Sequence, residues 1–324
     1  RAGGSNSFCT LLAIMSDECP SPAEAPSYRY FVGESSFSIY EEMVRLLRER
    51  GGEWEAATKP EAITTCALIL GDRFNIPYDR LRGSTRVFGP EGRKPLVNYF
   101  KGSHRLTLKA AMARLLREAV PHVDDFMPRS FILGRQATPS LARSSSRFSK
   151  FRGSNASTPA SSPVAAPADE RQELLCAHAR KPSAWIVKPS AGCKGVGIRV
   201  CATAEEAITA VDEAVAAEKS ADSAALFAVQ EYIANPLLLP GGRKFDIRVW
   251  ALVAAPFDIY VWDQGSCRTA SVAYDANDLS NPLAHLTNHG LQQSSASFGE
   301  HEEGNELWYS ALDAELRRRF GDGT

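Results

Sequence analysis

Lysines and glycines gather in one stretch of the sequence in a pattern that suits phosphate binding. Residues 185–200 place Lys188 and Lys194 beside Gly192, Gly195 and Gly197. Small residues let backbone N–H groups approach an anion, and lysines neutralise its charge. The stretch matches neither GxxxxGK[ST] nor GxGxxG, so a plain hairpin turn is the competing interpretation. We expect two strands joined by a loop that holds phosphate.

A second stretch, residues 243–253, alternates charged and apolar side chains as a strand does. Lys244, Asp246 and Arg248 are expected on one face, and Phe245, Ile247 and Val249 on the core face. Charges in a row are costly in a core unless they are paired or liganded, so this strand is predicted to line a cleft. An exposed strand with salt bridges is the alternative. Residues 257–262 are its expected hairpin partner, and Arg268 follows in another extended piece.

Two further segments are less specific. Residues 229–233 read as a strand that breaks at Pro236, which exposes backbone groups able to read an adenine edge, although any edge strand looks the same. His285 and His289 are spaced to clamp zinc on a helix. However, Thr287-Asn288 is a poor helix interior and HExxH is absent, so a polar loop at the cleft edge is the preferred interpretation.

The elements that must position these residues form an α/β pattern. Apolar spacing predicts a strand at 30–32, a helix over 39–47 and a buried strand at 67–70, which together make a small α/β unit. A helix is predicted from Ser103 to Ala119, with a buried stripe of Leu108, Met112, Leu115 and Leu116. A larger α/β domain is expected from residue 171 to Thr324.

Seven basic residues and no acidic one lie between residues 93 and 117. Lys101, Arg105 and Lys109 are four apart and would share a face of the predicted helix. A solvated face and a site for an acidic partner are both open interpretations.

Composition limits the remaining choices for the 324-residue chain. The net charge of −1 excludes a strongly basic nucleic-acid binder, and no stretch reaches the roughly 18 apolar residues that span a bilayer. The seven cysteines form no CxxC pair, which favours a reducing, cytoplasmic compartment. Residues 1–27 read as a disordered leader, and residues 134–170 read as a low-complexity basic, Ser- and Pro-rich insert.

In order and spacing, the blocks WIVKPSAGCKGVGI, VQEYIANPLLL, GRKFDIRVWALV, CRTASVAY and HLTNHGLQ resemble those of the tubulin–tyrosine ligase family, which has the ATP-grasp fold. Residues 70–73, 96–102 and 126–131 resemble the amino-terminal part of its tyrosine-adding member. The resemblance implies an α/β chain with a small amino-terminal domain and linker, residues 28–133, that docks tubulin. An ATP-grasp domain, residues 171–324, would follow the insert.

The resemblance also implies an activity: ATP-dependent ligation of free tyrosine to the carboxyl-terminal glutamate of α-tubulin through an acyl phosphate, with ATP and Mg²⁺ as cofactors. The partner would be the acidic tail of α-tubulin, in the cytoplasm and at the cytoskeleton, with no nucleic acid or membrane involved. The residues implied to bind ATP are Lys188, Lys194, Gly195, Val196, Gly197, Gln230, Glu231, Tyr232, Ile233, Lys244, Asp246, His285, Thr287 and Asn288. Arg248 and Arg268 would grip substrate carboxylates, while Arg73, Lys101, Arg105 and Lys109 would dock tubulin.

No metal ligand is expected in this chain, because the family's acidic metal ligands are expected beyond Thr324. The domain is therefore expected to be incomplete, and the 324-residue chain alone to have little ligase activity. Two alternatives stay open: a glutamylase or glycylase of the same family, and a catalytically dead module that binds tubulin.

Overall fold

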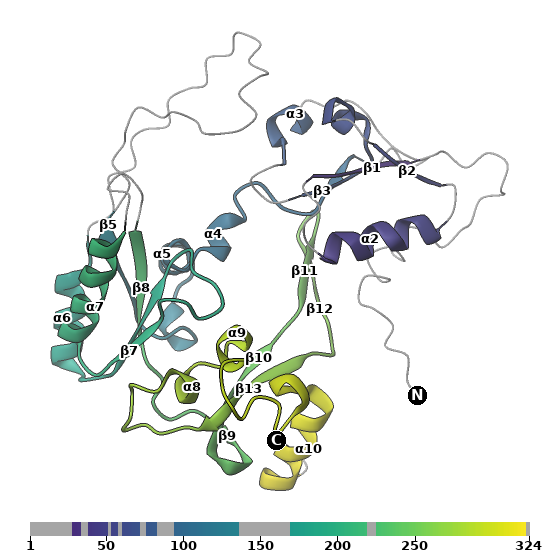
Figure 1. The fold of residues 1–324 in the computed structure, drawn as a ribbon. Coiled ribbons are helices and arrows are strands. Elements are labelled where there is room, and N and C mark those ends of the chain that lie inside the picture. Colours follow the sequence, from purple (N-terminus) through teal and green to yellow (C-terminus); the bar gives the residue numbers. More distant parts are fainter. Residues whose placement is uncertain are drawn as a thin grey trace. The chain divides into compact units, whose positions relative to one another are not determined.

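The computed structural model describes residues 28–33, 38–50, 53–57, 60–71, 76–82, 94–135, 169–218 and 225–321. The expected leader, nearly all of the expected insert and Arg73 lie outside these residues. The chain has a mixed α/β architecture with several sheets and divides into two compact units, residues 1–105 and 106–324 (Figure 1). No helix among the described residues has the length and apolar character needed to cross a membrane.

The first unit holds a parallel sheet in the order β2-β1-β3-β4. Its strands are β1 (Tyr28–Val32), β2 (Trp54–Ala56), β3 (Leu68–Leu70) and β4 (Leu96–Val97), and its helical elements are α2 (Ser38–Glu49), η1 (Pro60–Thr65) and α3 (Tyr78–Arg82). Met43 and Leu47 of α2 pack against Leu68 and Leu70 of β3. The elements of this unit include a strand, a helix and a buried strand at the positions expected from the apolar spacing.

The helix predicted over Ser103–Ala119 is wrong as a single element. The chain forms α4 (His104–Thr107) and α5 (Lys109–Ala119), which are separated by Leu108 in an extended conformation with φ −90° and ψ 118°. This break ends the helical phase, so Lys101, Arg105 and Lys109 do not share a helix face. The small side chains Ala110 and Ala113 are the buried residues of α5, whereas the expected stripe is half-buried.

The first sheet of the second unit is antiparallel, with the order β5-β8-β6-β7. Its strands are β5 (Ser130–Arg135), β6 (Trp185–Pro189), β7 (Arg199–Cys201) and β8 (Ala225–Glu231). Helices α6 (Arg171–Arg180) and α7 (Ala204–Ala217) lie side by side over one face (Figure 1). Because β5 pairs with β8, this unit begins well before the boundary expected near residue 171.

A second sheet, with the order β14-β13-β10-β9, carries the charged strand. Its strands are β9 (Leu238–Leu239), β10 (Arg243–Arg248), β13 (Ser266–Ala273) and β14 (Glu306–Trp308), and the helices α8 (Pro282–His285), α9 (His289–Gln292) and α10 (Tyr309–Phe320) belong to the same part of the chain. The expected hairpin is confirmed as β11 (Ala251–Ala254) and β12 (Asp258–Val261). β10 itself pairs with β13.

The expected core face of residues 245–249 is only partly correct. Phe245 packs in a cluster with Leu239 and Leu312. Ile247 and Val249 are 54% and 62% exposed, so the expected burial of these two side chains is wrong.

Candidate functional site

The lysine and glycine stretch forms the predicted strand–loop–strand. β6 and β7 pair antiparallel, and residues 190–198 form the loop between them, called the glycine loop below. Lys194, Gly195 and Gly197 have positive φ values of 56°, 84° and 69°. These conformations curl the loop back toward Asn288, whose side chain lies 3.2–3.3 Å from where a Cβ on Gly195 would be. The glycine loop and the 287–290 segment, far apart in sequence, are therefore neighbours.

Strand alternation puts Lys188 and Gln230 on the face of the sheet opposite α6 and α7. The register pairs Ile186 with Gln230 and Lys188 with Ala228, so the two polar side chains are diagonal neighbours on β6 and β8. Lys188 Nζ donates to Gln230 Oε1 at 2.7 Å. Burial, and then the charge of Lys109, lower the pKa of Lys188.

Lys244 on β10 approaches the same region from the second sheet. Its ammonium donates to the Tyr232 hydroxyl at 3.0 Å and lies 4.6 Å from the centre of the Tyr232 ring, a cation–π contact. Burial, and then the charge of Lys188, lower the pKa of Lys244 to about 8, while Asp246 opposes that shift. Among the described residues, no carboxylate lies within 4.0 Å of either Lys188 or Lys244.

Lys109, expected to dock a partner, lies instead beside the glycine loop. It is the first residue of α5, and its ammonium donates to the carbonyls of Pro189 at 3.1 Å and Gly192 at 2.6 Å. Burial lowers the pKa of Lys109. Ser190 also caps the start of α5, because its Oγ accepts from Ala110 N. Three positive charges thus converge here, and no local sequence pattern separates Lys109 from the other basic residues around it.

Asp246 and Arg268, expected to serve nucleotide and substrate separately, are joined to each other. They are opposite each other in the β10–β13 register, with guanidinium-to-carboxylate contacts of 2.8–3.1 Å. Thr287 donates a short hydrogen bond to the same carboxylate. Arg248, at the end of β10, is exposed, and no partner for its guanidinium is found in the part of the chain that the structure describes.

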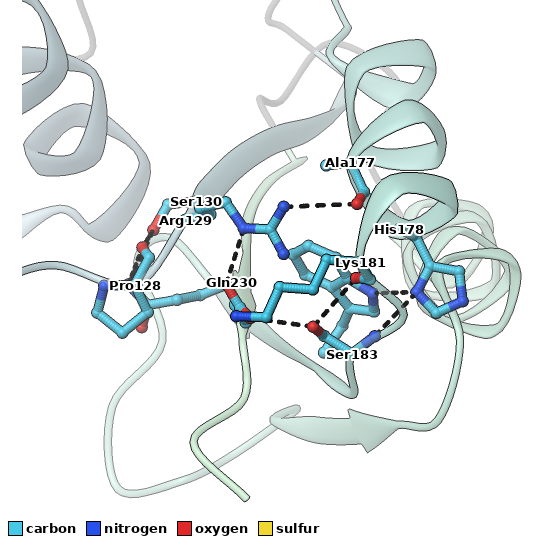
Figure 2. A network of polar contacts seen from close by, with 10 residues as sticks. Pro128, Arg129, Ser130, Ala177, His178, Lys181, Ser183 and Gln230 are labelled. Carbon is cyan, nitrogen blue, oxygen red and sulfur yellow. Dashed lines mark hydrogen bonds and ion pairs between the residues drawn. The ribbon is translucent and has the colours of Figure 1, made fainter. Parts of the chain in front are cut away.

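Glu231 points away from Lys188 and Lys244. It follows Gln230 on β8, and neighbouring side chains on a strand point to opposite faces, so Glu231 lies on the α6–α7 face. Its carboxylate accepts from Arg129 at 2.8 Å and from Ser183 at 3.0 Å. The Arg129 hydrogen bond is the main cause that lowers the pKa of Glu231 to about 2. Figure 2 shows the neighbouring polar contacts of Arg129, Ser183 and His178. The backbone N–H groups of Glu231 and Tyr232 bond to Arg129 O and Ala184 O, while the next side chain, Ile233, is exposed.

The two histidines are occupied within the protein. His285 is 2% exposed and both ring nitrogens are bonded, Nδ1 to the Tyr232 hydroxyl and Nε2 to Asp278 O, each at 2.7 Å. His289 stacks edge-on against Phe298. In the described part of the chain no group of three or more His, Cys, Asp or Glu side chains is placed to hold a metal ion.

The chain contains the tripeptide Glu303-Gly304-Asn305, which combines an acidic and an amide side chain. It forms the short 3-10 turn η4 (Glu303–Asn305). The Asn305 amide is buried and donates to Thr269 O and Ser271 Oγ. Glu302, the residue before this tripeptide, binds buried Arg243 through two contacts of 2.6 and 2.9 Å. These bonds brace β13 and leave Asn305 committed to the fold.

Two residues of the 93–117 basic run, one of them expected to dock tubulin, form ion pairs in the structure. Lys101 belongs to the first unit and pairs with Asp79 at 2.8 Å. Arg117, from the same basic run, holds Glu170 with contacts of 2.7 and 2.9 Å. At least these two residues of the run therefore have carboxylate partners that are distant in sequence.

The sequence profile of the tubulin-tyrosine ligase family matches residues 91–319. Among similar proteins, the human "Probable tubulin polyglutamylase TTLL2" is 29% identical over 213 residues, which cover 64% of this chain and 29% of that protein. The human "Tubulin polyglutamylase TTLL5" is 27% identical over 277 residues, 79% of this chain and 20% of that protein. "Tubulin glycylase 3D" of Tetrahymena thermophila is 35% identical over 120 residues, 36% and 11% of the two chains. The chain therefore spans only a minor part of the length of each of these relatives.

Proposed function

Because the chain belongs to the tubulin-tyrosine ligase family, we propose that it is part of an ATP-dependent ligase that joins an amino acid to a carboxylate of tubulin. One observation carries the nucleotide part of this proposal. Lys109, Lys188 and Lys244 converge beside a glycine loop, and the latter two have no carboxylate partner among the described residues. Burial of unpaired ammonium groups is unfavourable, so the site is suited to an anion that restores their charge balance.

The residues fit a polyphosphate. Lys188 and Lys244 each use one ammonium hydrogen on a neutral oxygen, which leaves two donors for an anion. The glycine loop would add backbone N–H groups, and the exposed segment after Glu231 would border the base, in the arrangement of an ATP-grasp site. The chemistry that bound ATP supplies is phosphorylation of the acceptor carboxylate, which makes its carbon electrophilic enough for an amine.

The protein's own groups then bind and orient. The ammonium groups would bind the negatively charged phosphates. Fixed cations in a site with little water stabilise such charge effectively. Arg248, whose guanidinium has no partner among the described residues, would grip a substrate carboxylate through two parallel hydrogen bonds. Asp246, whose charge acts on Lys244, is committed to Arg268 and Thr287, so we assign no step to Mg²⁺ in the described part of the chain.

For the incoming amino acid, the names of the similar proteins favour glutamate, with glycine second. Tyrosine stays a candidate because residues 96–102 and 126–131 resemble the tyrosine-adding member of the family. The expected acceptor is the acidic tail of tubulin.

Incubation of the protein with tubulin, ATP and labelled Glu, Gly or Tyr tests the proposal. Incorporation of Glu alone would support it in full, and incorporation of Tyr alone would replace glutamate by tyrosine. Nucleotide and tubulin binding without incorporation of any label would favour a binding module. Absence of ATP binding by calorimetry would refute the nucleotide site itself.

A further inference from the structure

Lys188 begins a chain of hydrogen bonds whose direction is fixed at its far end. Gln230 accepts from Lys188 through Oε1, and Gln230 Nε2 donates to Ser130 Oγ at 2.8 Å and, at the longer distance of 3.5 Å, to Pro128 O. Ser130 Oγ in turn donates to Pro128 O at 2.7 Å. Figure 2 shows the members from Gln230 to Pro128 close together. A carbonyl only accepts, so the single Ser130 hydroxyl hydrogen is used there, and its oxygen is left to accept from Gln230.

Lys244 begins a second chain built in the same way. It donates to the Tyr232 hydroxyl, which bonds His285 Nδ1, and His285 Nε2 bonds Asp278 O. Because Asp278 O only accepts, Nε2 carries a ring hydrogen, and Nδ1 is the ring nitrogen left to accept from the Tyr232 hydroxyl. The Tyr232 oxygen therefore presents lone pairs to Lys244.

Reversal of either chain would oppose the lysine at its start. A turned Gln230 amide would aim its NH₂ group at the Lys188 ammonium. A Tyr232 hydroxyl without an acceptor on residue 285 would be able to aim its hydrogen at Lys244. Ser130 and His285, the last side chains of the two hydrogen-bond chains, are buried, with exposed fractions of 4% and 2%. Neither is hydrogen-bonded to a lysine.

We propose that Ser130 and His285 are positioning residues of the lysine site, which fix the direction of these two chains and so keep Lys188 and Lys244 oriented as donors to a polyphosphate. This inference rests on the proposed nucleotide site. Ser130 acts through Gln230 and His285 acts through Tyr232, and neither touches the nucleotide.

Matched variants of the full chain test the proposal. Ser130→Ala removes the hydroxyl and Ser130→Thr keeps it. His285→Asn keeps an acceptor near Nδ1, while His285→Gln keeps only a donor near Nε2. Calorimetry with ATP and with AMP separates an effect on the phosphates from general damage, and a thermal melt reports folding.

We expect Ser130→Ala and His285→Gln to weaken ATP binding about tenfold, the size of one misdirected charge-assisted hydrogen bond, with a much smaller loss for AMP. Ser130→Thr and His285→Asn should retain most of the ATP affinity. In His285→Gln the Tyr232 hydroxyl can donate to the neutral amine of Lys244, which favours loss of the lysine proton. As pH rises, ATP binding should therefore be lost at a lower pH in His285→Gln than in His285→Asn.

Equal losses for ATP and AMP, or wild-type ATP affinity in Ser130→Ala and His285→Gln, would overturn the positioning role. If one variant does not fold, the pair at the other position decides the question by itself. A wild-type chain that binds neither ATP nor AMP would overturn the nucleotide site, and this inference with it.

Discussion

Asp246 and Arg268 face each other across β10 and β13, and the guanidinium holds the carboxylate by contacts of 2.8–3.1 Å. Thr287 binds the same carboxylate from a loop 41 residues away. The pair therefore fastens three segments at the edge of the lysine site. It also means that the guanidinium of Arg268 is paired, whereas that of Arg248 has no partner in the described part of the chain.

The Asp246–Arg268 pair should behave as a coupled unit in unfolding experiments. Asp246→Asn or Arg268→Gln leaves a half-buried polar group without its partner, and we expect each to lower the free energy of unfolding by about 1–3 kcal/mol. The double variant should lose clearly less than the sum, as measured by urea unfolding. Additive losses would show that the two side chains are not coupled.

Arg248→Ala should separate nucleotide binding from transfer. The side chain is exposed and has no partner among the described residues, so stability should change by less than about 0.5 kcal/mol. We expect ATP binding to be largely retained and amino-acid transfer to tubulin to be abolished. Arg248→Lys is the control, since it keeps the charge without the paired donors. A matching loss of ATP affinity in Arg248→Ala would contradict the role.

Binding of ATP should take up protons near pH 8. The pKa of Lys244 is about 8, and a bound anion would raise it, so part of the population gains a proton on binding at pH 8 and little at pH 6. Calorimetry in two buffers of different ionisation enthalpy measures this uptake. Lys244→Met should reduce it, and an unchanged uptake would exclude Lys244 as its source.

The charged form of Lys244 should destabilise the folded protein, whereas a lysine in a salt bridge would stabilise it. Its folded pKa lies below the ordinary value of 10.5, so its ammonium form destabilises the fold below pH 8, and that cost is relieved as pH rises from 8 toward 10.5. Lys244→Met should therefore be more stable than wild type at pH 7, with the difference shrinking toward pH 10. A variant less stable at pH 7 would contradict the burial argument.

Gly195→Ala should weaken ATP binding through the glycine loop. Gly195 has φ +84°, and an added Cβ would lie 3.2 Å from Asn288, so the variant meets both strain and a neighbour. Gly241→Ala is the matched control, with φ +78° and no atom within 4 Å of the added Cβ. Each should lose about 1 kcal/mol of stability, but only Gly195→Ala should lower ATP affinity in calorimetry. Equal ATP affinity in the two variants would argue against a role for the loop.

Glu231→Gln should destabilise the protein at neutral pH and have little effect in acid. The pKa of Glu231 is held at about 2, mainly by its hydrogen bond from Arg129, so its contribution is present above the ordinary value of 4.5. That contribution is lost as pH falls from 4.5 toward 2. Thermal melts of wild type and variant at pH 7 and pH 2.5 should show a much smaller difference at the lower pH. ATP affinity at pH 7 should be little changed, because this side chain lies on the α6–α7 face.

The sequence pattern predicted those elements that depend on residues close together in the chain. The strand–loop–strand around Lys188, the small α/β unit and the hairpin at 251–261 follow from alternation, helical spacing and glycine conformations, which neighbouring residues determine. The break at Leu108 could not be predicted in this way, because residues 103–119 have continuous helical periodicity. Docking of Lys109 and Ala110 against Ser190 favours a new helix start there.

The sequence by itself determined the chemical groups available: lysines beside glycines, an alternating charged strand, and blocks typical of one ligase family. Tertiary structure decided which of these groups are paired with each other and which of them belong to the lysine site. Asp246 is committed to Arg268, Glu231 lies on the far face with Arg129, and Lys109 joins the lysine site. Strand register and the pairing of distant segments fix these outcomes, because a charge alters its site only through the groups that folding places within a few ångströms of it.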